Sequence, residues 1–193
     1  MTTFSAALLV GGQSTRMGCD KALLPWPGPD RVLWRRQLSI LEELQPEQIF
    51  WSGPLRPGVP EHVITVEDAV KAAGPLAGIS ACLQLLPSEL LVVLAVDMPE
   101  MNAAFLRRML ATCSPGCGAV ARHGDFFEPL AAVYPKEIAP LATKQLEANR
   151  LALQDFMVRG IETGVLRSIS VASEDRALLR NLNEPRDLSK RGN

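Results

Sequence analysis

The chain lacks the patterns that mark several large classes of protein. Its 193 residues carry 20 lysines and arginines against 21 aspartates and glutamates, with no block of basic residues, so we expect no nucleic-acid partner. No apolar run approaches the roughly 20 residues of a membrane-spanning helix. The first apolar run is short, and no cationic segment precedes it as in a secretory signal. These absences predict a cytoplasmic protein that does not bind a membrane.

Cysteine and histidine are also scarce. The four cysteines, at positions 19, 82, 113 and 117, are too scattered for a disulfide scaffold, and only His123 lies near the last two. Buried or unreactive thiols are therefore expected rather than a metal site. Neither His62 nor His123 stands in a catalytic motif, and a G-x-S-x-G sequence is missing, which argues against a serine hydrolase.

The order of apolar patterns predicts an α/β, Rossmann-like protein with a mainly parallel sheet flanked by helices. Strand patterns alternate with helical ones, and two strands around a polar turn at 123–125 predict a hairpin. We expect strands over residues 5–10, 48–52, 62–66, 90–96 and 165–171, two more within 119–134, and helices over 32–44, 79–86, 102–111, 139–147 and 152–158. With no internal repeat or low-complexity linker, a single domain over residues 1–193 is expected.

The most informative segment joins an apolar strand to a glycine-rich loop. It reads LLVGGQSTRMGCDK at positions 8–21, which matches neither G-x-G-x-x-G nor the P-loop. Glycines just beyond the carboxyl end of a strand let backbone N–H groups approach phosphate oxygens. Arg16 and Lys21 supply positive charge in the same segment. The segment therefore predicts a phosphate-binding loop.

Residues 9–24 resemble the signature L-x-G-G-x-S-x-R-M-G-x-D-K-x-L-L of nucleotidyltransferases with the nucleotide-diphospho-sugar transferase fold. Within that superfamily the chain is most similar to the molybdenum cofactor guanylyltransferases. The resemblance implies an enzyme that transfers GMP from GTP to the phosphate of molybdopterin and releases pyrophosphate, with Mg²⁺ as cofactor. It also implies partner proteins that deliver or accept the molybdenum cofactor. The nucleotide-binding part would span about residues 1–100 and the acceptor-binding part about 101–193.

A carboxylate ends the most apolar predicted strand, in the sequence VLAVDMP at positions 93–99. In open α/β sheets, ligands bind at the carboxyl ends of the strands. Mg²⁺ binds through one or two carboxylates together with phosphate oxygens, so Asp97 is a candidate metal ligand. The alternative is that Asp97 caps the helix that follows. The resembling family carries D-x-P at this point with the Asp as metal ligand, which favours the first assignment.

Two motifs precede Asp97 in the sequence: Glu67-Asp68, and then GPLAGI at 74–79. In the resembling family the Asp contacts the guanine nucleotide and the G-P-L-A-G turn opens a helix beside the nucleotide and pterin pockets. The resemblance thus assigns Asp68 to the nucleotide, and Gly74 and Gly78 to the acceptor. An ordinary junction of loop and helix, with Pro75 in the first turn, is the alternative. Together with the first loop, this motif favours GTP over CTP.

Two later segments also resemble family segments, EPLAAVY at 128–134 and NLNEPRDL at 181–188. The amides of Asn181 and Asn183 are candidates for binding the pterin or its phosphate. Asn183 is also suited to capping a helix whose first turn contains Pro185.

The predicted site has three overlapping sets of residues. The nucleotide-binding set is Leu9, Gly11, Gly12, Gly18, Lys21, Asp68 and Asp97; the catalytic set is Lys21 on the α-phosphate, Arg16 on the β- and γ-phosphates and Asp97 on Mg²⁺; the acceptor-binding set is Gly74, Gly78, Asn181 and Asn183. Val10 and Glu184 depart from the family's usual Ala and Thr. The alternatives to a guanylyltransferase are a cytidylyltransferase or sugar-phosphate nucleotidyltransferase on the same fold, or a non-catalytic nucleotide-binding adaptor.

Overall fold

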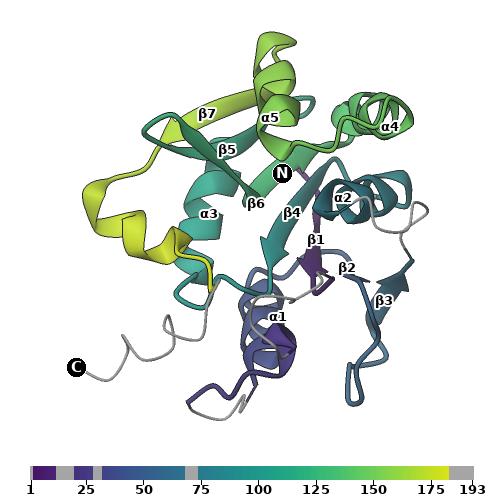
Figure 1. The fold of residues 1–193 in the computed structure, drawn as a ribbon, viewed down its shortest axis with the longest axis vertical. Coiled ribbons are helices and arrows are strands. Elements are labelled where there is room, and N and C mark those ends of the chain that lie inside the picture. Colours follow the sequence, from purple (N-terminus) through teal and green to yellow (C-terminus); the bar gives the residue numbers. More distant parts are fainter. Residues whose placement is uncertain (1, 12–19, 28–31, 68–73, 183–193) are drawn as a thin grey trace.

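The computed structural model describes residues 2–11, 20–27, 32–67 and 74–182, whose strands form one seven-stranded sheet (Figure 1). The strands are β1 (Phe4–Leu9), β2 (Ile49–Ser52), β3 (Val63–Val66), β4 (Leu90–Ala95), β5 (Gly118–His123), β6 (Phe126–Pro135) and β7 (Leu166–Ser170). Their order is β3-β2-β1-β4-β6-β5-β7. Only β6 among them runs antiparallel to its neighbours, so the other six end at the same edge of the sheet.

Helices cover both faces of the sheet. They are α1 (Leu33–Glu43), α2 (Pro75–Gln84), α3 (Ala103–Ala111), α4 (Ala139–Glu147) and α5 (Leu153–Glu162), with short 3₁₀ helices η1 (Lys21–Leu23), η2 (Lys136–Ile138) and η3 (Ser173–Leu179). Helices α1 and α3 pack on one face. There the rings of Trp34 and Trp51 pack edge to face, with their centroids 5.3 Å apart. Helices α2, α4 and α5 pack on the other. Two hydrophobic cores thus sandwich the sheet.

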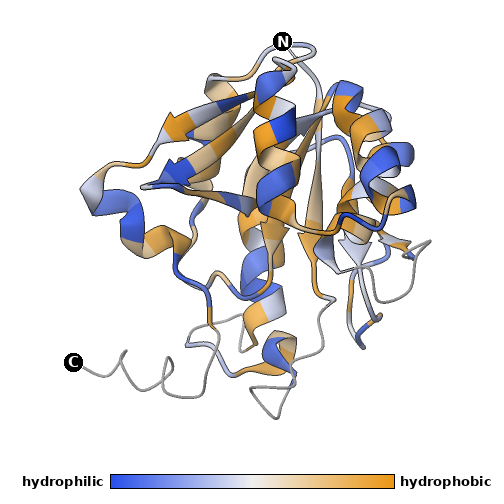
Figure 2. Cartoon of the chain, turned by 45° about the horizontal axis from the view of Figure 1, so that its top comes forward, coloured by the Kyte–Doolittle hydropathy of each residue, from blue (hydrophilic) through white to orange (hydrophobic). Residues whose placement is uncertain are grey.

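The burial of the sheet explains its sequence pattern. All six residues of β4 are buried, because this central strand has a neighbouring strand on each side and helices on both faces. In Figure 2 the central strands are coloured mostly as hydrophobic, whereas the helices around them carry both hydrophobic and hydrophilic residues. Helix α1 buries Trp34, Leu38 and Leu41 at the three- and four-residue spacing of an amphipathic helix.

The predicted mainly parallel α/β sheet is confirmed, and each predicted strand and helix is present. The hairpin of β5 and β6 is also confirmed, with Gly124 at φ +59° in its turn. The prediction for α5 ended too early, at residue 158, because a glycine inside a helical pattern suggests a boundary. Gly160 instead packs so closely that a Cβ there would lie 2.7 Å from Leu166 Cδ1. The short 3₁₀ helices η1, η2 and η3 were not predicted.

Within the described ranges, none of the helices is both long enough and apolar enough to cross a bilayer.

Candidate active site

The ends of β1 and β4 lie side by side at the carboxyl edge of the sheet. The two strands are paired in parallel, with Leu9 opposite Ala95. Leu9 lies in the core, and its carbonyl accepts a hydrogen bond from Val96 N at 3.0 Å. Gly11 and Asp97 each stand two residues beyond this last pair. The pairing therefore brings the start of the glycine-rich loop next to the predicted metal ligand.

Gly11 is packed against the loop that follows β2. Val10 N donates to Ser52 O at 2.9 Å, and Gly53, the first residue after β2, has φ +122°. A Cβ built on Gly53 would lie 2.5 Å from Gly11 N, closer than side chains approach backbone. Glycine is therefore required at position 53 for the two loops to meet. The sequence pattern of the region identifies only a turn there and does not link it to the phosphate loop.

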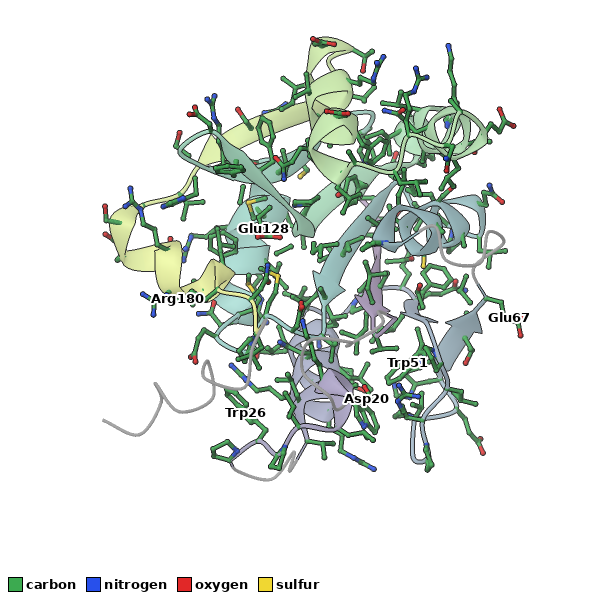
Figure 3. All side chains as sticks on the ribbon, viewed as in Figure 1. Asp20, Trp26, Trp51, Glu67, Glu128 and Arg180 are labelled. Carbon is green, nitrogen blue, oxygen red and sulfur yellow. The ribbon has the colours of Figure 1, made fainter. Side chains whose placement is uncertain are left out.

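Lys21 is carried by the short helix η1. Asp20 caps this helix by accepting a hydrogen bond from Ala22 N at 3.1 Å, and its carboxylate also pairs with the Arg56 guanidinium. The side chains of Ala22 and Leu24 are buried in the core. Figure 3 labels Asp20 at the start of η1. These contacts fix the backbone that carries Lys21.

The predicted phosphate-binding cation and the predicted metal ligand form an ion pair. Lys21 Nζ lies 2.8 Å from Asp97 Oδ2, and the two side chains are only 18% and 20% exposed. In this partly buried setting the pair is screened less than one on the open surface. Of the residues assigned to the catalytic set, the described part of the chain thus brings Lys21 and Asp97 into direct contact.

Helix α1 holds the turn that carries Asp97. Gln37, fully buried, donates from Nε2 to Met98 O at 2.6 Å. Arg36 donates from Nε to Pro99 O at 3.0 Å. These two residues face carbonyls about 60 positions later in the sequence, and the sequence patterns do not point to them. They are positioning residues for Asp97.

Asp97 does not cap the following helix. The N-cap of α3 is Asn102, whose side chain accepts a hydrogen bond from Phe105 N at 2.8 Å. The alternative assignment of Asp97 as a helix cap is therefore wrong, and its carboxylate faces Lys21 instead.

Glu128 on β6 is a further carboxyl near Asp97 that the predicted site did not include. Its Oε1 accepts a hydrogen bond from Leu130 N at 3.3 Å. Burial, with a smaller contribution from the negative charge of Asp97, raises the pKa of Glu128 to about 7. Figure 3 labels Glu128 near the middle of the molecule. The sequence signal that could have identified it is the EPLAAVY segment, which the prediction matched to the family without assigning a role.

The acceptor-binding candidates occupy different places. Leu182 N donates to Asp97 O at 2.7 Å, which brings Asn181 to the turn carrying Asp97. Gly74, with φ +69°, precedes Pro75 in the first turn of α2, and Gly78 is buried within that helix. Their contacts with an acceptor stay predictions.

Five predicted site residues lie outside the described residues: Gly12, Arg16, Gly18, Asp68 and Asn183. Their roles stay predictions.

The donor atoms at this edge suit Mg²⁺ bound with a nucleotide. In the described part of the chain, no three His, Cys, Asp or Glu side chains are grouped closely enough to hold a metal ion by themselves. Mg²⁺ bound to nucleotides needs only one or two protein carboxylates, because phosphates and waters complete its octahedron. A partly exposed carboxylate such as Asp97 fits that requirement.

The chain is similar to several known proteins. A chain from Opitutus terrae, named "Probable molybdenum cofactor guanylyltransferase", is 36% identical over 191 residues, covering 96% of this chain and 93% of that one. One of the same name from Pelotomaculum thermopropionicum is 31% identical, covering 98% and 92%. The crystal structure of molybdopterin-guanine dinucleotide biosynthesis protein A from Archaeoglobus fulgidus has the same fold, with a TM-score of 0.74, 23% identity and coverage of 96% and 95%. The family of MobA-like NTP transferase domains matches residues 6–162, and the chain belongs to this family.

Proposed function

We propose that the chain transfers GMP from GTP to the terminal phosphate of molybdopterin and releases pyrophosphate. Family membership supports a nucleotidyl transfer, and the names of the relatives support this donor and this acceptor. The observation that carries the proposal is the contact of Lys21 with Asp97 at the carboxyl ends of β1 and β4.

The chemistry requires charge stabilisation rather than proton transfer. An oxygen of the acceptor phosphate attacks the α-phosphorus of GTP in line. A new P–O bond forms to the acceptor, the bond between the α-phosphorus and the bridging oxygen breaks, and pyrophosphate leaves with the electron pair. Because the nucleophile is already an anion, no general base is needed. The protein must hold two polyanions together and stabilise the charge that develops on the transferring group.

Lys21 is placed for that task. Its ammonium group stands at the edge where backbone N–H groups of the loop after β1 would meet phosphate. Because η1 is anchored through Asp20 and Ala22, little reorganisation of the backbone is needed when the ammonium turns toward the α-phosphate. Arg16 in the same loop would contact the β- and γ-phosphates.

Asp97 would hold Mg²⁺ together with phosphate oxygens of GTP. The bound cation would neutralise charge on the phosphates and the departing pyrophosphate. Gln37 and Arg36 keep the Asp97 turn in place through its carbonyls, so the carboxylate is oriented before substrates bind.

Calorimetric titration with GTP, CTP and ATP, each with and without Mg²⁺, tests the donor. We expect selective binding of GTP, strengthened by Mg²⁺ in the natural chain and much less so in Asp97→Asn. The exposed Asp125→Asn, with a side chain 97% exposed, is the matched control and should behave like the natural chain. Release of pyrophosphate on adding molybdopterin then tests the transfer.

Three results would contradict the proposal, each in a different way. Preference for CTP would assign the chain to cytidylyl transfer on the same fold. Tight GTP binding without release of pyrophosphate in the presence of molybdopterin would indicate a binding protein that lacks the chemistry. Absence of nucleotide binding would refute the phosphate loop itself.

A further inference from the structure

An open pocket lies where β5 and β7 end and η3 begins (Figure 1, where η3 is the yellow helix). Its volume is about 300 Å³, and it is lined by the end of β5, the hairpin turn, β7 and Arg176 of η3. Strands β6 and β5 stand between β7 and β4, the strand that precedes Asp97. None of the residues that line this pocket belongs to the predicted nucleotide, catalytic or acceptor sets. The pocket is therefore distinct from the candidate active site.

The pocket carries positive charge. Its lining includes Arg122 and Arg176 but no aspartate or glutamate. Among the described residues, none forms a hydrogen bond or an ion pair with Arg176, and its neighbour Asp175 is paired with Arg108 at 2.5 Å. Asp125 lies 3.6 Å from Arg122 Nη2, but its side chain is 97% exposed, so water weakens this pair. The charge of the two arginines thus remains available to an anion.

The guanidinium group of Arg122 is held in place by the hairpin. Its Nε donates to Gly124 O at 2.9 Å, and its Cζ lies 5.8 Å from the centre of the Phe127 ring, within the range of a cation–π contact. Its Nη1 has no hydrogen-bond partner in the part of the chain that the structure describes. A guanidinium group fixed in this way loses little conformational freedom when it binds an oxyanion.

Two serine hydroxyls lie on the same face of the sheet as Arg122. Ser170 is opposite Arg122 in the pairing of β5 with β7, and Ser168 comes two residues earlier, so the three side chains point to the same side. Both serines are exposed, and neither hydroxyl is hydrogen-bonded within the described ranges. His123 reaches the pocket from the last position of β5. Arginine, serine and histidine side chains thus present N–H and O–H groups to one cavity.

These donors suit a phosphate group. A phosphate ester or inorganic phosphate carries a charge of about −1.5 to −2 at pH 7 and offers three or more acceptor oxygens. Guanidinium groups bind such oxygens through paired hydrogen bonds, and hydroxyl groups can occupy the oxygens that remain. The lining contains no Phe, Tyr or Trp on which a nucleobase could stack. The chemistry therefore favours a small phosphorylated compound over a nucleotide.

We propose that this pocket is a second anion site, which binds the phosphate group of a small molecule independently of the glycine-rich loop. Arg122 and Arg176 supply the charge, while Ser168 and Ser170 donate hydrogen bonds to the remaining oxygens. The site goes beyond the proposed transfer of GMP, because it lies outside every set of residues assigned to that reaction.

The chain has two histidines, which provide a local and a remote reporter for the test. His123 lines the pocket, whereas His62 is outside it and is hydrogen-bonded to Glu42 at 3.0 Å. The full chain is titrated with inorganic phosphate, pyrophosphate and glycerol phosphate, each against sodium chloride of equal ionic strength, while NMR follows the imidazole signals at constant pH. We expect a saturable shift of the His123 signal and an unmoved His62 signal. The probe that binds most tightly distinguishes a free anion from a phosphate ester.

Arginine variants then locate the binding. Arg176→Gln and Arg122→Gln should each weaken it at least about tenfold, because each removes a charged hydrogen-bond donor. Arg159→Gln makes the same change of charge at an exposed position of α5 outside the pocket, so it is the matched control and should keep the affinity. Lys21→Ala should also keep the His123 response, since Lys21 belongs to the candidate active site. Thermal unfolding of each variant checks that it is folded.

Three results would overturn the inference. Equal shifts of the His123 and His62 signals, or an equal response to chloride, would show general screening of charge. Unchanged affinity in the folded Arg176→Gln variant would exclude the pocket as the place of binding. Loss of the His123 response in Lys21→Ala would assign the anion to the glycine-rich loop. None of these measurements depends on transfer of GMP, so their failure would leave the proposed function standing.

Discussion

Lys21 Nζ and Asp97 Oδ2 meet at 2.8 Å although 76 positions separate them in the chain. The lysine follows the glycine-rich loop in the sequence and the aspartate follows the central strand, so their contact joins the two motifs on which the predicted site depends. A divalent cation bound to a carboxylate oxygen repels an ammonium group from that oxygen. We therefore expect Lys21 to leave Asp97 for the nucleotide's phosphate when GTP and Mg²⁺ bind.

Replacing Lys21 tests its role in the transition state. In Lys21→Ala we expect kcat to fall about a hundredfold or more, because a donor aimed at developing charge is lost. The KM for GTP should change by less than about threefold, since the other phosphate contacts are kept. Steady-state release of pyrophosphate measures both constants. Lys136→Ala, at an exposed position, is the control and should turn over like the natural chain. If Lys21→Ala also turned over at nearly the natural rate, Lys21 would have no role in the mechanism.

Replacing Gln37 tests whether the turn of Asp97 is positioned by α1. Gln37→Leu keeps the buried volume but leaves Met98 O without its donor, which we expect to destabilise the fold by about 1 to 3 kcal/mol. The kcat should fall while the affinity for nucleotide without Mg²⁺ is kept, because Asp97 rather than the phosphate loop is displaced. Urea denaturation and the metal dependence of turnover measure these effects. Lower stability with an unchanged response to Mg²⁺ would make Gln37 a purely structural residue.

Gly53 tests the close approach of the loops after β1 and β2. Gly53→Ala places a Cβ 2.5 Å from Gly11 N at φ +122°, so we expect a loss of about 2 kcal/mol or more in the free energy of unfolding and weaker GTP binding. Gly124→Ala is the matched control, because Gly124 also has positive φ but a Cβ there would meet nothing within 4 Å. Thermal unfolding and GTP titration of both variants measure the difference. Equal effects in the two would show that backbone conformation alone, rather than contact with Gly11, requires glycine at 53.

The sequence predicts what depends on local pattern and on the rules of parallel sheets. The apolar run of β4 followed by Asp97, and the loop that ends in Lys21, sufficed to place both residues at one edge. Contacts between distant segments were not predictable in the same way. Gln37 is a polar residue within an amphipathic helix, and only the folded chain shows that it is buried against Met98 O. The carboxyl of Glu128 likewise becomes buried, and its pKa is raised, only in the folded chain.

The raised pKa of Glu128 predicts a pH dependence of stability with a definite sign. Its pKa is about 7 in the folded chain against an ordinary value of 4.5 for a glutamate side chain, so the folded state binds the proton more tightly than the unfolded state does. The stabilisation that the folded state gains from this tighter proton binding is fully present below pH 4.5 and is lost as the pH rises through about 7. Between about pH 5 and about pH 8 the natural chain should lose ~2 kcal/mol that Glu128→Gln keeps.

Urea denaturation of the natural chain, Glu128→Gln and Asp125→Asn at those two pH values measures this difference. Asp125 is almost fully exposed, so its variant should follow the natural chain at both. We expect Glu128→Gln to be the more stable protein at about pH 8, with a gap that narrows at about pH 5. A gap of the same size at both pH values would trace the effect to packing and would contradict the titration.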